Sequence, residues 1–353
     1  MTVPAEAPLS LTAVAPPVEA RIDDLLRAEV TRWSEVDPEL VPPLEALRRF
    51  VLEGGKRLRP AFCHWAFVGA GGDPADPVVV DAGAALELLH AFALLHDDVM
   101  DGSRLRRGRT TVHIDFAGRH GSEGWRGEGR RFGEGVAILV GDLAFVYADL
   151  LMVGAPPEAT GVFNELRVEL NIGQALDLIG TAQARRDRPM AQRIARYKSG
   201  KYTIERPLHL GAALVGRTGD LAAPLSAYGL PLGEAFQMRD DILGTFGDPA
   251  VIGKPVGDDL REGKPTPLLA VAWDRADAAG RKLLDRVGYP DLAPDEIAAI
   301  QALMTETGAR DETERLIDEL AAEAVGALQK AAITADARTA LTDLAAFVVH
   351  RDR

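Results

Sequence analysis

Two groups of aspartates, each preceded by an apolar stretch, are the residues of this sequence with the clearest chemistry. Asp97, Asp98 and Asp101 form the first group, and Asp97 and Asp101 share one helix face because they are four residues apart. Asp240 and Asp241 form the second. Carboxylates crowded at a helix C-terminus repel each other and oppose the helix dipole, and divalent cations would offset both penalties. Either pair alone is more simply an acidic, solvated helix end, but two such pairs predict binding of Mg²⁺, which prefers oxygen ligands.

Three sets of basic residues accompany the acidic motifs. Residues 54–60 (GGKRLRP) place three cations at a predicted helix start, where a diglycine lets the backbone approach an anion closely. A second set directly follows the first acidic motif, where arginines would balance the aspartates or bind diphosphate with both arms of the guanidinium. The second and third sets are Arg104, Arg106, Arg107 and Arg109, and Lys198, Lys201, Lys254 and Lys264. Carboxylates that bind metal in one place and basic residues in another suggest two distinct diphosphate sites, one with metal and one without.

The elements that must position these residues follow a helical period almost throughout, so we expect one large all-α domain without an internal linker. Residues 77–101 form an apolar helix that we expect to be buried and central. The second acidic motif ends the predicted helix 221–246, and a Gly/Pro-rich loop follows over 247–267. Residues 118–135 are poor in apolar side chains and predict a loop. Residues 1–17 predict a disordered tail, so the domain is expected over 18–353.

Composition excludes several classes of protein. The sequence has 40 Lys and Arg against 53 Asp and Glu, and a formal net charge of −13 argues against a nucleic-acid partner. Cys63 is the only cysteine, so no intrachain disulfide can form, and a reducing, cytoplasmic location is expected. Charged residues interrupt the apolar stretches, so we expect no transmembrane segment.

Taken together, the motifs resemble those of the trans-polyprenyl diphosphate synthases. The matching segments are GGKRLRP at 54–60, ELLH at 87–90, DDVMD at 97–101, RRG at 106–108, Lys198-Ser199 and FQMRDD at 236–241. The order and spacing of these segments cover most of the chain from about residue 20 to 270. The resemblance implies the isoprenoid synthase fold, a helical bundle around a central cavity. It also implies a homodimer, three Mg²⁺ ions per active site, and isopentenyl and allylic diphosphates as substrates.

Roles for individual residues follow from the same resemblance. It implies that Asp97, Asp101 and Asp240 ligate metal directly, whereas Asp98, Asp241 and Asp258 support the ligands or the metal-bound waters. The allylic diphosphate would be held by Arg106, Lys198 and Lys254, with Lys264 in the same loop as a further substrate ligand. Isopentenyl diphosphate would be held without metal by Lys56, Arg59, His90 and Arg107. Thr203 and Gln237 would line the reaction centre.

One position departs from the family pattern. The second motif of the family often reads Asp-Asp-x-x-Asp, and Gly244 stands here where the last Asp would be. The first Asp of that motif is its main metal ligand in the family, so we expect weaker outer support rather than loss of activity.

Product length in the family depends on the residues just before the first acidic motif. Ala93 lies one helical turn before Asp97, Leu89 lies a further turn away, and Phe92 points more to the side. An aromatic residue at 92 with a small residue at 93 resembles enzymes that form geranylgeranyl diphosphate (C20). Farnesyl diphosphate (C15) is the alternative product. The simpler interpretation is that Phe92 is an ordinary core residue, which is the default for a Phe on an apolar helix.

Other functions stay open at the level of sequence. A class I terpene cyclase would share the first acidic motif but would not need residues 54–60 or Arg107 for a second diphosphate. A His-Asp phosphohydrolase would explain His96-Asp97, but no further His ligands stand at a suitable spacing. An inactive partner subunit of a heteromeric synthase is a non-enzyme alternative, which the intact aspartates oppose.

Overall fold

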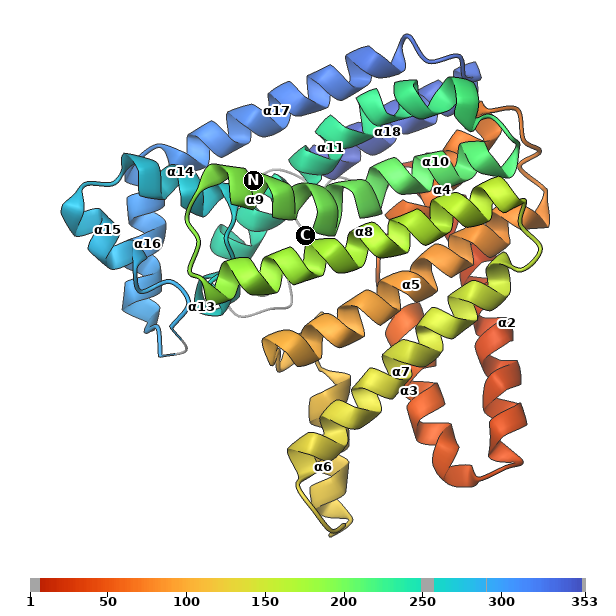
Figure 1. Ribbon diagram of the computed structural model, residues 1–353, viewed down its shortest axis with the longest axis horizontal. Helices are drawn as coiled ribbons and strands as arrows, with labels where there is room; N and C mark the ends of the chain where they lie inside the picture. Colours follow the sequence, from red (N-terminus) through yellow and green to blue (C-terminus); the bar gives the residue numbers. More distant parts are fainter. Residues whose placement is uncertain (1–6, 249–256, 290, 351–353) are drawn as a thin grey trace. The chain divides into compact units, whose positions relative to one another are not determined.

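The computed structural model describes residues 7–248, 257–289 and 291–350, and its described elements are almost all helices, as expected (Figure 1). Contacts divide the chain into two compact units. One comprises Leu9–His64 and Asp73–Pro156, and we call it the α5 unit. The other comprises Met1–Pro8, Trp65–Gly72 and Pro157–Arg353, and we call it the α11 unit. The expected extent of a single domain, residues 18–353, stays a prediction.

The α5 unit is built around one long helix, α5, which packs on α7, α2 and α3. Its elements are α1 (Leu9–Thr12), α2 (Ala15–Ser34), η1 (Pro38–Leu40), α3 (Val41–Leu52), the start of α4 (Leu58–Gly69), α5 (Pro77–Asp101), β1 (Leu105–Arg106), β2 (Arg109–Thr110), α6 (Val112–Ser122) and α7 (Gly129–Met152). The Asp76 side chain accepts a hydrogen bond from the Val78 N–H and caps the start of α5, and Gly102 ends α5 in the left-handed conformation. The predicted buried helix 77–101 is thereby confirmed.

The α11 unit is built around α11, which contacts α10, α17, α18 and the π-helix η2 (Figure 1). Its elements are α8 (Pro157–Ala182), α9 (Arg188–Ile194), η2 (Ala195–Glu205), α10 (Arg206–Leu214), α11 (Thr218–Phe246), α13 (Asp258–Glu262), α14 (Pro267–Arg275), α15 (Ala278–Leu284), α16 (Pro294–Glu306), α17 (Ala309–Leu328) and α18 (Ala335–His350). A satellite core under α14–α16 includes Leu268, Ile300 and Met304.

Two expectations about local structure were wrong. Residues 9–12 and 15–34 are helical, with Leu11 and Val14 buried, so the expected tail of residues 1–17 is in part folded. Residues 118–135 are mostly helix, since α6 extends to Ser122 and α7 begins at Gly129. The two helices approach so closely at Gly133 that a Cβ there would lie 2.0 Å from a carbonyl oxygen. Because the two helices contact each other through glycine, the segment has few apolar side chains from which a helical period could be recognised. A short β1–β2 hairpin was also unexpected.

Two described helices, α5 and α7, are long and apolar enough to cross a membrane by length and composition. Most of the apolar stretch of α5 is buried inside the protein, which is usual for the core helix of a globular domain.

Candidate active site

The first acidic motif lies at the C-terminal end of α5, as the sequence predicted. Asp98 is buried, and its Oδ1 accepts hydrogen bonds from Arg106 Nε at 2.8 Å and Nη2 at 2.7 Å. The same Nη2 lies 3.5 Å from Oδ2 of Asp97. Arg106 therefore positions Asp98, whereas Asp97 and Asp101 are less deeply buried. This arrangement agrees with a supporting role for Asp98 and a ligand role for its two neighbours.

The β1–β2 hairpin brings Arg106 and Arg107 to this motif. Its two-residue turn is Arg107-Gly108, and both residues have positive φ, 53° and 75°. Such turns match the twist of a hairpin, but the conformation is costly for a side chain other than Gly or Asn. Arg107 Nη1 donates to the Glu53 carbonyl at 3.2 Å, beside the Gly54-Gly55 turn. The strained turn thus directs Arg107 to the predicted diphosphate loop.

His90 is the centre of a basic cluster in the α5 unit. Burial lowers the pKa of His90 well below its ordinary value, and the positive charges of Arg59, Arg107, Arg106 and Arg57 lower it further. A neutral imidazole among four guanidinium groups is an arrangement that favours an anion. Lys56 and Arg59 come from the same GGKRLRP segment, with Arg59 buried. The α5 unit therefore brings together Arg59, His90, Arg106 and Arg107 from the predicted set.

Arg57, which the sequence did not assign a separate role, holds this segment in place. Its Nη1 donates to Glu87 Oε2 at 2.8 Å, its Nε to Glu19 Oε1 at 3.0 Å, and its Nη2 to the Val51 carbonyl at 2.8 Å. Arg57 and Glu87 are almost fully buried. This buried ion pair joins the GGKRLRP segment to the middle of α5.

The second acidic motif lies near the end of α11. Gln237 Nε2 donates a hydrogen bond to Asp241 Oδ1 at 2.7 Å, so Gln237 helps to orient the Asp241 carboxylate. Asp241 is buried, and Asp240 is partly exposed beside it. Lys264 pairs with Glu262 at 2.5 Å. Lys254, expected to hold the allylic diphosphate, lies outside the described residues.

Lys198 and Thr203 belong to η2, a π-helical segment within a continuous helical stretch from Arg188 to Leu214. Wide π turns are rare and are frequent at functional sites. Lys198 Nζ donates to Asp177 Oδ2 on α8 at 2.5 Å, and Thr203 is fully buried. Sequence analysis did not identify Asp177 as a functional residue. The available signal was that this acidic residue lies on the buried face of α8, which also includes Leu166, Leu170, Gly173 and Gly180.

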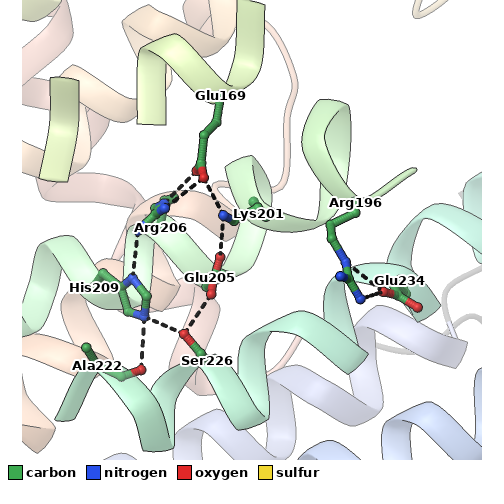
Figure 2. Close-up of polar contacts among 9 residues, drawn as sticks. All are labelled: Glu169, Arg196, Lys201, Glu205, Arg206, His209, Ala222, Ser226 and Glu234. Atoms are coloured by element: carbon green, nitrogen blue, oxygen red, sulfur yellow. Dashed lines mark hydrogen bonds and ion pairs between the residues drawn. The ribbon is translucent and has the colours of Figure 1, made fainter. Parts of the chain in front are cut away.

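A buried polar network fixes η2 against α8 and α11 (Figure 2). Glu169 of α8 accepts hydrogen bonds from Arg206 Nε at 2.6 Å and from Lys201. Burial opposes ionisation of Glu169, but these hydrogen bonds outweigh burial and lower its pKa. Ser226 of α11 donates to Glu205 at 2.6 Å. Lys201 thus pairs with two buried carboxylates, those of Glu169 and Glu205, whereas Lys198 pairs with Asp177.

Of the predicted chain-length residues, Leu89 is fully buried and Phe92 and Ala93 are half-buried. The Phe92 ring lies 4.6 Å from the His96 ring and 4.8 Å from the Phe145 ring of α7, measured between centroids. His96 Nε2 lies 3.0 Å from the Ile138 carbonyl, which supports a structural role for His96. Phe145 was not apparent from the sequence because the α5–α7 contact is long-range.

Comparison with known proteins decides what kind of protein carries these features. A family model described as polyprenyl synthetase matches residues 43–304. The chain belongs to the polyprenyl synthetase family. It is 32% identical to the short chain isoprenyl diphosphate synthase of Methanothermobacter thermautotrophicus over 94% of this chain and 95% of that one. It is 34% identical to the geranylgeranyl diphosphate synthase of Mycobacterium tuberculosis, over 80% of this chain and 77% of that one.

A solved structure of a family member supports the same assignment. The geranylgeranyl pyrophosphate synthase of Corynebacterium glutamicum, complexed with isoprenyl diphosphate and magnesium, is 36% identical and superposes with a TM-score of 0.88. The alignment covers 95% of this chain and 98% of that chain. The expected isoprenoid synthase fold is thereby confirmed. Polyprenyl synthetases use a divalent metal and diphosphate substrates.

The acidic residues fit such a metal. Among the described residues, no three His, Cys, Asp or Glu side chains form a group that would hold a metal ion by themselves. Mg²⁺ does not require such a cage, because it binds through one or two carboxylates, water and substrate phosphates. Asp241 Oδ2 is buried and has no hydrogen-bond partner among the described residues, which is a place that a cation or its water would complete.

Proposed function

We propose that this polyprenyl synthetase is a short-chain trans-prenyltransferase that joins isopentenyl diphosphate to allylic diphosphates and forms mainly geranylgeranyl diphosphate. The basic cluster around His90 is the observation that carries this proposal. It offers an anion site built from guanidinium groups and a neutral imidazole, in addition to the two acidic motifs. A chain-elongating enzyme needs two diphosphate sites, whereas a terpene cyclase needs one.

The residues divide between the two substrates in this proposal. Arg106, Lys198 and Lys264 bind the allylic diphosphate, and Asp97, Asp101 and Asp240 hold the Mg²⁺ ions, three per active site. Bound Mg²⁺ supplies Lewis-acid polarisation of that diphosphate and neutralises its charge. Lys56, Arg59, His90 and Arg107 bind isopentenyl diphosphate without metal. His90 serves as a neutral hydrogen-bonding group there, because its lowered pKa keeps it unprotonated at neutral pH.

The bond changes need no nucleophilic side chain. The allylic C–O bond breaks, and fixed cations such as Lys198 stabilise the charge on the leaving diphosphate. The alkene of isopentenyl diphosphate forms the new C–C bond with the allylic cation. The proton lost from the adduct passes to the released diphosphate. Thr203 and Gln237 line this reaction centre, and η2 carries both Lys198 and Thr203.

A homodimer is the proposed assembly. Leu139, Val146 and Leu150 of α7 and Val153, which caps its C-terminal end, form an exposed apolar stripe with spacings of seven, four and three residues. Val168, Ile172 and Ile179 form a second exposed stripe on α8. Apolar patches of this kind typically mark protein interfaces. Light scattering of the purified protein tests the assembly. The same proposal places the enzyme in the cytoplasm without a membrane span.

One assay tests the activity. The purified protein is incubated with labelled isopentenyl diphosphate, Mg²⁺ and a C5, C10 or C15 allylic diphosphate, and the products are sized. We expect elongation with a C20 main product, and a C15 product would select the farnesyl alternative. Diphosphate release from the allylic substrate alone, with a cyclic product, would favour a terpene cyclase. No elongation with any starter would refute the proposal.

A further inference from the structure

A single peptide group in the α15–α16 connection joins two segments of the α11 unit that are far apart in the sequence. The carbonyl of Val287 accepts a hydrogen bond from Arg186 Nη2 at 2.9 Å. The N–H of the same peptide group belongs to Gly288 and donates to the Leu260 carbonyl of α13 at 2.8 Å. The α8–α9 loop therefore holds one edge of this peptide group, and α13 holds the other.

The same turn packs against the segment that carries Lys264. A Cβ at Gly263 would lie 2.6 Å from the Gly288 Cα, so the two backbones are in direct contact. On the other side of Lys264, a Cβ at Gly180 of α8 would lie 3.0 Å from Cγ of Pro265 (Figure 1). The chain before and after Lys264 is therefore confined by close contacts, with the turn on one side and α8 on the other.

Lys264 lies close to the second acidic motif from this confined position. Burial raises the pKa of Asp241 well above its ordinary value, and the nearby positive charge of Lys264 opposes that shift. A lysine side chain loses conformational freedom when it binds an anion. A backbone that is already fixed lowers the total cost of holding a diphosphate at this place.

Arg186 reaches the turn from a strained end of α8. Ala184 has a φ of 48°, a left-handed conformation that usually requires Gly at the end of a helix. The Arg186 guanidinium is partly buried, and burial lowers its pKa. Its Nη groups donate to the carbonyls of Arg185 and Val287, whereas its buried Nε has no hydrogen-bond partner among the residues that the structure describes. A partly desolvated charge satisfied in this way contributes little stability, which favours a positional role.

We propose that Arg186 is a positioning residue for Lys264 and, through it, for the allylic diphosphate. Arg186 acts through the Val287–Gly288 peptide group, which sets the backbone of Gly263 next to that lysine. The inference rests on the proposed function, because it takes Lys264 to be a ligand of the allylic diphosphate. A simpler explanation is that Arg186 only anchors the α8–α9 loop. The two explanations differ in whether the affinity for one substrate changes selectively.

Binding of a substrate analogue tests the proposal without turnover. Isothermal titration with Mg²⁺ present measures the affinity of the full chain for a geranyl diphosphate analogue in which sulfur replaces the bridging oxygen, so that it ionises very slowly. We expect R186M to weaken binding of this analogue about 10-fold, because small displacements of a binding group are costly. R186K retains a donor and should recover part of the loss. A folded R186M with unchanged affinity would overturn the proposal.

The neighbouring arginine provides the matched control. Arg185 lies in the same loop but is exposed and pairs with Asp187, so R185M should change the affinity for the analogue less than about 2-fold. Thermal melting shows whether each variant folds. R186Q, which removes the charge and shortens the side chain, takes the place of R186M if that variant does not fold.

A double-mutant comparison separates positioning from anchoring. If Arg186 acts through Lys264, R186M should weaken analogue binding less than about 2-fold further in a K264M background. The affinity of R186M for isopentenyl diphosphate should also change less than about 2-fold, because that site lies in the α5 unit. Additive losses in R186M/K264M, or equal weakening of both substrates, would refute the proposal. Failure of the elongation assay with intact analogue binding would instead reject only the proposed activity.

Discussion

Lys198 donates a hydrogen bond from Nζ to Oδ2 of Asp177 over 2.5 Å, which ties the π-helix η2 to α8. Asp177 is buried, so the pair has a fixed geometry that an exposed lysine would lack. The ammonium group is thereby oriented before any diphosphate binds, and preorganised cations stabilise developing negative charge without reorganisation.

Substitution of Asp177 by Asn should weaken this orientation. We expect kcat/KM for the allylic diphosphate to fall about 10-fold, equivalent to about 1.4 kcal/mol. The control is D274N, which removes the exposed partner of Arg188 and should change kcat/KM less than about 2-fold. An unchanged kcat/KM in D177N would show that the pair does not prepare Lys198 for substrate.

The Arg57–Glu87 pair should be the ion pair of the α5 unit whose disruption costs most. E87Q removes the buried carboxylate beside the buried guanidinium and leaves only the more exposed Glu19 as its charged partner, and we expect the free energy of unfolding to fall by about 3–5 kcal/mol. E19Q removes the more exposed partner of the same arginine and should cost at most about 1 kcal/mol. Urea unfolding measures both, and similar losses in the two variants would contradict this ranking.

The approach of α11 to η2 depends on glycine. A Cβ at Gly233 would lie 2.5 Å from the Gly200 Cα, and backbone atoms cannot move aside as a side chain can. G233A should therefore destabilise the protein by about 1–3 kcal/mol in thermal or urea unfolding. G161A is the matched control in α8, where a Cβ meets no atom within 4 Å, and it should be neutral or stabilise by up to about 1 kcal/mol. Equal effects would mean that the contact is not tight.

His90 should make stability depend on pH. Its folded-state pKa is depressed, so the unfolded chain binds more protons below about pH 6.5, and stability should rise with pH up to that value. Other buried histidines contribute too, so the test compares the unchanged protein with H90Q by urea unfolding between pH 5 and 8. We expect H90Q to show a shallower dependence below about pH 6.5. Identical pH profiles would refute the assignment.

Phe92 should limit product length. The ring contacts His96 and Phe145, so F92A opens space beside Ala93, just before the first acidic motif, and we expect longer products when reaction mixtures are sized. V80A, near the opposite end of α5, should leave product length unchanged. An unchanged product length in F92A would show that Phe92 is an ordinary core residue.

The helical class and both acidic motifs were predictable because they depend on local features. The 3.6-residue period fixes α5 and α11, and adjacent aspartates at the end of an apolar helix identify themselves by spacing. The basic residues Lys56, Arg59 and Arg107 were also predictable, because they lie in short segments whose sequence and order resemble those of the family. The helices at residues 118–135 were not predicted, because α6 and α7 contact each other at Gly133 and the segment lacks an apolar stripe with a helical period.

Tertiary structure decided what depends on residues far apart in the chain. Nothing in the local sequence pairs Lys198 with Asp177, places Phe145 on Phe92, or brings four guanidinium groups around His90. The sequence by itself determined that residue 244 lacks a carboxylate, and the fold decided that the Asp259 carboxylate of α13 lies against Gly244. Composition and spacing are properties of one segment, whereas the meeting of two segments depends on how their helices pack.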